Sequence, residues 1–275
     1  MSSISSGFQP DDGRAWLKGA ARAGYFARGL VFAIVGYFAF RAAFASGQTL
    51  DTKDAIEVIA GSVFGTILLA AIVVGLAAFA AWRMVQVTLD VDGHGTGAKG
   101  LFVRAGLLVS AFSYGALALY AGSLLTGLGS GGGDGGGGGG VISYAYEKGF
   151  GIWVTYAVAA GMAAAAIAHF VKAVKAGFER YMSIPDDRQW AVKPICQFGL
   201  IARGTTFVVI AGLLATGAAG YKSGDTPGLD AALAEIASWS FGWLLLSLTG
   251  LGLIAFGLYC FAESWYRRIN MPQVG

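Results

Sequence analysis

The sequence predicts an all-α membrane protein with six transmembrane helices arranged as three repeated hairpins. Composition is the first observation, because 56% of the 275 residues are hydrophobic and 13% are charged, against roughly 25% charged in a soluble domain. The second is six apolar runs of roughly the twenty residues that a helix needs to cross about 30 Å of hydrocarbon. The third is that the runs recur in related pairs, while the alternation of a membrane β-barrel is absent.

Two short motifs define the repeat. The first opens one run of each pair, as Arg22-Ala-Gly-Tyr-Phe-Ala-Arg-Gly29, Arg104-Ala-Gly-Leu-Leu-Val-Ser-Ala111 and Gln197-Phe-Gly-Leu-Ile-Ala-Arg-Gly204. The second heads the partner run as Phe64-Gly65, Phe150-Gly151 and Phe241-Gly242, and a glycine follows eleven positions after each phenylalanine, at Gly75, Gly161 and Gly252. We therefore expect one membrane hairpin in three copies.

The elements follow from these motifs and from the ends of the apolar runs. Transmembrane helices are expected over residues 24–45, 63–82, 101–126, 151–171, 196–219 and 241–262. Residues 1–21 are expected to form a cytoplasmic N-terminal tether, in which residues 15–23 lie as a short amphipathic helix. The hairpin repeats cover residues 22–86, 101–175 and 195–268, and linkers rich in Asp, Gly, Lys and Pro, such as residues 90–100 and 183–194, join them.

The loops that close the hairpins differ between copies. The first and third contain similar amphipathic segments, residues 51–60 and 229–237, whose early Asp residues suit helix N-termini. The middle hairpin has instead a glycine-rich outer loop over residues 127–140. No strand precedes its glycine tract and no Lys followed by Ser or Thr closes it, so the tract indicates a flexible spacer rather than a phosphate loop.

Basic residues predict the orientation. Fifteen Lys and Arg residues fall on the side of the two termini, and four fall on the other side: Arg41, Lys53, Lys148 and Lys222. By the positive-inside rule both termini are cytoplasmic. The net charge of +3 hides this asymmetry and gives no argument for a nucleic-acid partner.

Two arginines within spans mark the candidate site. Arg28 and Arg203 occupy equivalent repeat positions, each four residues after a motif glycine. One interpretation is that they extend to cytoplasmic headgroups or form structural ion pairs; the other is that they bind an anionic lipid or solute. Further polar groups end the even-numbered helices: Arg83, Gln86, His169, Lys172 and Glu263. We assign lipid or anion binding to Arg28, Arg203, Arg83 and Lys172.

Glu263 is the single acidic residue at that level of the even-numbered helices. A carboxylate without a partner would be costly there, so Arg203 or Arg28 is expected to pair with it. The middle repeat has Ser110 where the others have Arg28 and Arg203. This asymmetry favours a binding notch over a charge-selective pore.

Two sets of residues on the same helices are expected to serve packing. Phe32, Tyr114 and Phe207 lie four residues after Arg28, Ser110 and Arg203 and share their helix faces, and core packing explains them better than a ligand box does. Small-residue pairs such as Ala71 with Gly75, and Gly161 with Ala165, predict close contacts between helices.

No catalytic residue, metal or cofactor is expected. The sequence lacks His-Glu-x-x-His, Gly-x-Ser-x-Gly, a nucleotide-binding loop and an acidic pair within a span. Cys196 and Cys260 form no Cys-x-x-Cys motif and are expected to be reduced thiols at cytoplasmic helix ends. His94 and His169 have no neighbour at metal-ligand spacing.

The Gly-x-x-Ala-Arg-Gly opening and the Phe-Gly heads resemble those of the bacterial membrane family called domain of unknown function 1206. The resemblance covers nearly the whole chain and implies a multi-pass protein of the bacterial cytoplasmic (inner) membrane, with six spans in three two-helix repeats. The middle repeat departs from the pattern at Ser110 and in its glycine-rich loop. No activity is implied.

We therefore expect a non-enzymatic membrane protein that binds lipids, anionic ones included, or serves as an accessory or scaffold component of a membrane complex. Assembly as a homo-oligomer or within a larger complex is compatible with its small-residue faces. The alternative is a small channel or transporter for ions or small solutes along the axis between the hairpins. Hairpins of the same orientation are not the inverted repeats common in carriers, and no span has a central carboxylate.

Overall fold

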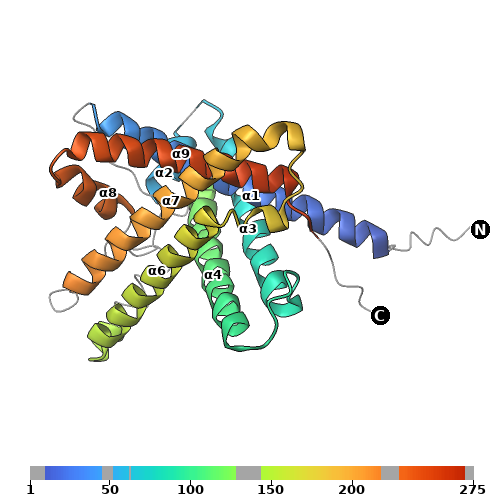
Figure 1. The fold of residues 1–275 in the computed structure, drawn as a ribbon, viewed down its shortest axis with the longest axis horizontal. Helices are drawn as coiled ribbons and strands as arrows, with labels where there is room; N and C mark the ends of the chain where they lie inside the picture. Colours follow the sequence, from blue (N-terminus) through green and yellow to red (C-terminus); the bar gives the residue numbers. More distant parts are fainter. Residues whose placement is uncertain (1–9, 45–51, 62, 128–143, 218–228, 270–275) are drawn as a thin grey trace, which may run out of the picture.

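The computed structural model describes residues 10–44, 52–61, 63–127, 144–217 and 229–269 (Figure 1). The elements in order are α1 (Pro10–Ala42), α2 (Thr52–Ala60), α3 (Gly65–Leu89), α4 (Ala98–Thr126), α6 (Gly151–Val174), the 3-10 turn η1 (Glu179–Tyr181), α7 (Asp186–Gly217), α8 (Leu229–Ser238) and α9 (Gly242–Tyr266). No strand occurs in these ranges. Six helices are long and apolar enough to cross a membrane, namely α1 from Lys18 onward, α3, α4, α6, α7 and α9. The all-helical, multi-pass architecture is thereby confirmed.

Two helices begin earlier than the apolar runs indicate. α1 is continuous from Pro10, so the short helix expected over residues 15–23 is its first part rather than a separate element. α7 begins at Asp186 and contains Pro194, which we had placed at the end of a linker. Asp186 and Asp187 in the first turn of α7 favour a helix start there because they oppose the helix dipole.

The short helices α2 and α8 match the amphipathic segments predicted at residues 51–60 and 229–237. Ile56 and Ile59 of α2 are buried, as are Leu233 and Ile236 of α8. The glycine tract of the middle loop lies outside the described residues. α2 and α8 therefore bury apolar side chains against the long helices beside which they lie.

The long helices form an open arc in the order α4, α3, α1, α9, α7, α6. α1 packs along α9, α3 along α4, and α6 along α7, while α1 also contacts α3 and α7 also contacts α9. α4 and α6 share no comparable interface among the described residues, and they diverge toward the lower edge of Figure 1. The two ends of the arc are thus the two helices of the predicted middle hairpin.

Burial follows the order of the arc. In the most apolar 18-residue stretch of each span, 61% of α9 and 56% of α1 are buried, but only 11% of α4 and 17% of α6. Large apolar side chains on α4 and α6 are correspondingly exposed, among them Val109, Phe112, Trp153 and Ile167. In a membrane these surfaces face lipid or whatever fills the gap between the two helices.

Glycines allow a close helix approach between α1 and α9. A Cβ atom added at Gly36 would lie 2.6 Å from the backbone nitrogen of Ile254 and 2.7 Å from the carbonyl oxygen of Gly250. One added at Gly257 would lie 2.7 Å from the carbonyl oxygen of Gly29. Only glycine permits backbones to approach this closely, so these four residues hold the centre of the arc together.

The glycines of the hairpin motifs divide into two groups. In α1 and α3, a Cβ atom at Gly24 or at Gly75 would come within 2.6 Å of Phe79 or Ala27, respectively. In α7 and α9, Gly199 and Gly252 make the equivalent contacts with Phe256 and Ala202.

In α4 and α6, by contrast, Cβ atoms at Gly106 and Gly161 would meet no atom of the described residues within 4 Å. The close contact that we predicted for Gly161 is therefore wrong, whereas the one predicted for Gly75 is confirmed.

Candidate functional site

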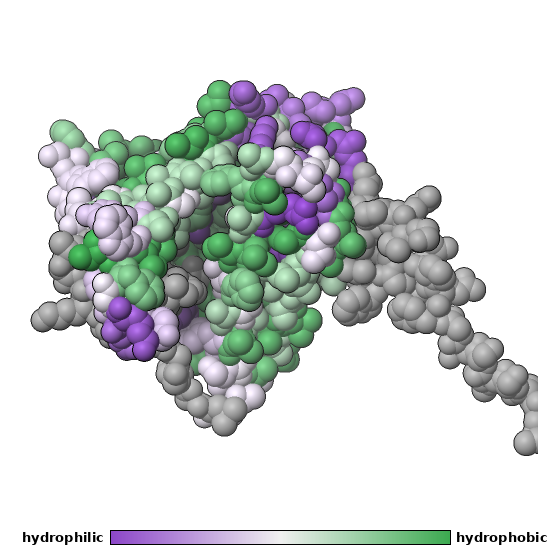
Figure 2. All heavy atoms as spheres, turned by 90° about the horizontal axis from the view of Figure 1, so that it is seen from below, coloured by the Kyte–Doolittle hydropathy of each residue, from purple (hydrophilic) through white to green (hydrophobic). Residues whose placement is uncertain are grey.

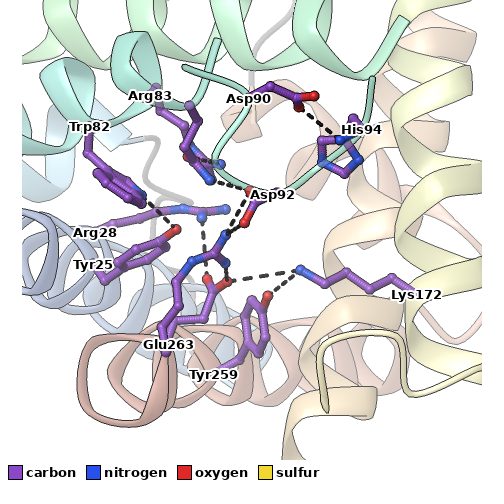
Figure 3. Close-up of polar contacts among 12 residues, drawn as sticks. Tyr25, Arg28, Trp82, Arg83, Asp90, Asp92, His94, Lys172, Tyr259 and Glu263 are labelled. Atoms are coloured by element: carbon purple, nitrogen blue, oxygen red, sulfur yellow. Dashed lines mark hydrogen bonds and ion pairs between the residues drawn. The ribbon is translucent and has the colours of Figure 1, made fainter. Parts of the chain in front are cut away.

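Glu263, in the last turn of α9, is the centre of the site (Figure 3). It is 2% exposed. Nη1 of Arg267 donates a hydrogen bond of 3.0 Å to Oε1 of Glu263. Nη1 of Arg28 lies 4.0 Å from Oε2, and Nζ of Lys172 lies 4.0 Å from Oε1. Helices α1, α6 and α9 therefore bring three cations to one carboxylate, which offsets the cost of burying it.

Asp92, in the linker between α3 and α4, supplies a second carboxylate. Nη2 of Arg267 lies 3.1 Å from both of its oxygens. The amide nitrogen of Gln86 donates to Asp92 at 2.6 Å, and Arg83 donates to the amide oxygen of Gln86 at 3.0 Å. A continuous hydrogen-bonded chain thus joins the end of α9 to α3, and charge-assisted bonds of this kind are the stronger ones.

Arg267 directly follows α9, outside the spans. Burial by itself would lower its pKa, but the neighbouring Tyr25, Glu263 and Asp92 raise the pKa above the usual value for arginine. Its guanidinium also lies 5.3 Å from the centres of the Tyr25 and Tyr181 rings. Arg267 is therefore a permanently charged link between the two carboxylates.

Asp90 fixes the linker that carries Asp92. Its backbone is left-handed, with φ of 45°, where α3 ends. Its carboxylate accepts hydrogen bonds from the backbone nitrogens of His94 at 2.8 Å and Gly95 at 2.7 Å. These two bonds hold the pKa of Asp90 below its usual value. An ionised Asp90 closes the turn that presents Asp92.

Aromatic rings surround the two arginines within the spans. The guanidinium of Arg28 lies 4.8 Å from the ring centre of Phe256, and the rings of Phe79, Tyr114 and Phe32 follow at 5.4, 5.7 and 5.9 Å. Arg203 lies 4.5 Å from the ring centre of Phe32 and 4.2 Å from that of Phe207.

Phe32, Tyr114 and Phe207, which we assigned to packing, therefore also face the guanidiniums and stabilise them by cation–π attraction.

Arg203 differs from Arg28 in having no ion pair with any carboxylate in the described part of the chain. Its Nη1 is buried and lacks a hydrogen-bond partner there, as does Nε of Arg28. The side chain of Arg28 is only 11% exposed, so it pairs with Glu263 rather than extending to headgroups. Of the two partners expected for Glu263, the structure provides Arg28 and not Arg203.

His169 of α6 lies beside Arg203. Its ring meets that of Phe207 edge-on, with centres 5.3 Å apart. Nδ1 of His169 lies 2.8 Å from the carbonyl oxygen of Ala165 and must donate to it, because a carbonyl can only accept. On the neighbouring turn, Lys172 donates to the hydroxyl of Tyr259 at 2.5 Å. The face of α6 that carries these residues thus borders the cluster.

We define the cationic cluster as five cations and two carboxylates: Arg28, Arg83, Lys172, Arg203, Arg267, Asp92 and Glu263. Five positive charges minus two negative charges leave a surplus of +3. All four residues assigned to anion binding from the sequence belong to it. Within the described ranges no three His, Cys, Asp or Glu side chains gather as metal ligands would, and Cys196 and Cys260 are buried and free.

Arg267 and Asp92 are the members that sequence reasoning missed. The sequence does indicate the depth at which the cluster lies in the bundle. Gln86, Lys172 and Glu263 each lie twenty-two positions after a motif phenylalanine, so they are expected at the same depth. Arg267 could have been found as the residue four after Glu263, one helical turn away. Nothing in the linker sequence distinguishes Asp92 from Asp90.

A surface pocket of about 230 Å³ adjoins the cluster through Arg267. Its lining is mostly basic: Lys18, Arg22, Arg267, Arg268 and Ile269. Of these residues only Arg267 belongs to the cluster. The pocket is therefore a second, more exposed place where an anion could bind.

Comparisons with known proteins give a family but no activity. A sequence model of the family described as Domain of Unknown Function (DUF1206) matches residues 23–90 and 198–267. The chain is 33% identical to the uncharacterized protein YxxB of Bacillus subtilis (strain 168) over 266 residues, which cover 94% of each chain. No solved structure matches. The two matched segments cover nearly all of the first and third predicted hairpins and leave out the middle one.

Proposed function

Because the chain belongs to the family described as Domain of Unknown Function (DUF1206), a description that names no activity, we propose a function from the site alone. The protein is a non-enzymatic component of the bacterial inner membrane that binds an anionic membrane lipid at the cationic cluster. An accessory or scaffold role in a larger membrane complex is compatible with this binding. Nucleic acid is not a partner.

One observation carries the proposal: the cluster has a buried centre, Glu263 with Arg267, and partly buried cations around it, but it is not neutralised. Glu263 and Asp92 are both engaged by Arg267, and Arg203 has no carboxylate within pairing distance among the described residues. Buried charge is normally paired, because desolvating an isolated ion is costly. A phosphate group would supply the missing negative charge, and arginine binds phosphate through paired hydrogen bonds.

The finer topology is part of the same proposal. The three hairpins are copies of one unit, and both termini are cytoplasmic because the basic residues gather on their side. The cluster then lies toward the inner leaflet, where anionic headgroups attract cationic side chains. The matching contacts of Gly24 with Phe79 and of Gly199 with Phe256 support a repeat relationship between the first and third hairpins.

No observation favours the channel alternative. Glu263, Arg267 and Phe256 are each 7% exposed or less, and they occupy the level of the cluster where a path along the axis would have to pass. The charges of Glu263 and Arg267 are held in the ion pairs described above. A conducting path would require those pairs to separate.

Lipid retained on purification tests the proposal, with Arg203→Gln as the variant. Arg203 holds no ion pair with a described residue, so the change is expected to lower bound phosphatidylglycerol several-fold, measured by native mass spectrometry, while folding is preserved. Added phosphatidylglycerol at about one hundred times its Kd should stabilise the unmodified protein by about 2.7 kcal/mol. Phosphatidylcholine should stabilise it far less.

Two control variants separate the cluster from general surface charge. Arg41→Gln removes an exposed cation at the far end of α1, and Arg22→Gln removes one from the surface pocket. Both are expected to keep their lipid. If Arg22→Gln lost lipid while Arg203→Gln kept it, the headgroup would lie in the surface pocket and the assignment to the cluster would be wrong.

A further inference from the structure

We propose that the gap between α4 and α6 is a lateral opening in which a phospholipid lies, with its acyl chains against Gly106 and Gly161 and its anionic headgroup at the cationic cluster. The inference rests on the proposed function, because it needs an anion at the cluster. It adds the route from the bilayer and the residues that shape it. The headgroup belongs to a membrane lipid and not to a free solute, since the opening faces the hydrocarbon.

The first argument is that α4 and α6 lack a contact that the first pair of helices, α1 with α3, and the third pair, α7 with α9, both make. Gly24 packs on Phe79 and Gly199 packs on Phe256, but a Cβ atom at the corresponding Gly106 would lie more than 4 Å from every atom in the described part of the chain. The same holds for Gly161, which corresponds to Gly75 and Gly252. The middle pair has the glycines that allow close approach but leaves them uncovered.

The second argument is that the middle pair, α4 with α6, has small side chains where the first and third pairs have large ones. Fifteen positions after the motif phenylalanines stand Phe79, Ala165 and Phe256. Ser110 likewise replaces the arginine of the other two units. The side chains that would fill the space between α4 and α6 are therefore absent from exactly one of the three units, and dispersion contacts across it are lost.

The third argument is that the uncovered faces lead to the cluster. Gly106, Ser110 and Tyr114 lie four residues apart on one face of α4, and Gly161, Ala165 and His169 do so on α6. Tyr114 is the ring 5.7 Å from Arg28, and His169 lies against Phe207, which packs on Arg203. An occupant of the gap would therefore have the two arginines at its polar end.

The chemistry of the gap identifies the occupant. The face over α4 and α6 is mostly apolar and is hollowed, as Figure 2 shows from below. Val109 of α4 is 66% exposed, and Gly106 and Gly161 are exposed as well. At the inner end the cluster has a surplus of +3 and a buried Nη1 of Arg203 that has no acceptor among the described residues. Only a molecule with apolar chains and an anionic head satisfies both ends, which describes an anionic phospholipid.

Leucine substitutions that fill the gap test the proposal. Gly161→Leu and Gly106→Leu are each expected to lower bound phosphatidylglycerol several-fold in native mass spectra. The melting temperature without added lipid should change by no more than a few degrees, because a Cβ atom at either site meets nothing. Gly212→Leu is the matched control, since Gly212 of α7 is also exposed with no atom within 4 Å, and it should keep its lipid.

The outcomes separate this inference from the function on which it rests. If Arg203→Gln loses lipid while both leucine variants keep it, the cluster binds the headgroup but the gap is not its route, and the inference is wrong. If Arg203→Gln keeps lipid, the proposed function is wrong. If the leucine variants keep their lipid but convert a dimer to a monomer, a helix of a second copy fills the gap and the inference is again wrong.

Discussion

Gly24 of α1 lies against Phe79 of α3, whereas Gly106, at the corresponding position of α4, contacts nothing on α6. Both hairpins have a glycine that would permit the approach. What differs is the facing residue, because Phe79 corresponds to Ala165 in the middle unit. A glycine makes close packing possible, but a side chain large enough to fill the groove is needed to make it favourable.

α4 and α6, the helices at the two ends of the arc, pack on other helices and not on each other. α4 packs on α3 and α6 packs on α7, so each helix of the middle unit joins a neighbouring unit. The first and third predicted hairpins also meet directly through α1 and α9, whose glycines allow a close backbone approach. The six long helices therefore form an asymmetric arc with one opening.

Glu263→Gln is expected to have the largest effect on stability. It gives the third hairpin the amide that the first hairpin has at Gln86. It leaves Arg28 and Lys172 without their carboxylate, and breaking a buried ion pair costs about 3 to 5 kcal/mol. Denaturant unfolding in detergent micelles measures the loss. Glu147→Gln, at an exposed position, should change stability by about 0.5 kcal/mol or less. Equal stability of the two variants would show that the cluster does not hold α9 in place.

Cysteine pairs compare the hairpins directly, in a background with alanine at positions 196 and 260. Ala27→Cys with Gly75→Cys is expected to cross-link, because an ideal Cβ at Gly75 lies 2.6 Å from that of Ala27, and a separation of the two helices by about 1 Å brings these atoms to the spacing that a disulfide needs. Val109→Cys with Gly161→Cys occupies the corresponding positions and is expected to stay reduced, since a disulfide needs Cβ atoms about 3.5 to 4.5 Å apart.

Gel mobility after mild oxidation in membranes measures both pairs. Ala202→Cys with Gly252→Cys serves as a second positive control. Rapid cross-linking of the middle pair would show that α4 and α6 close on each other, and the asymmetry described above would then be absent from the membrane.

Acidification should produce the smallest effect, confined to the linker that attaches α4 to α3. The lowered pKa of Asp90 means that its hydrogen bonds contribute fully above its ordinary pKa of about 3.9 and are lost as the pH falls through the lowered value. Protease cleavage within residues 90–97 is expected to rise only under strongly acidic conditions. Asp90→Asn should make cleavage faster at neutral pH and nearly independent of pH. A pH response that survives in this variant would assign it to another group.

Local sequence features were enough to predict the six helices, the repeated motifs and the depth in the bundle at which the polar cluster lies. These features are local: an apolar run of sufficient length must be helical in lipid, and the spacing from Phe64, Phe150 and Phe241 places Gln86, Lys172 and Glu263 at one depth. The extended starts of α1 and α7 were missed because polar residues can continue a helix beyond the hydrocarbon.

The tertiary structure alone decided which helices pair and which charges meet. Sequence spacing could not show that Arg267 and Asp92 would meet, because Asp92 reaches the end of α9 only when the linker after α3 folds back. Nor could it show the opening between α4 and α6. Helix packing depends on the residue that each glycine faces, and that residue is supplied by another part of the chain.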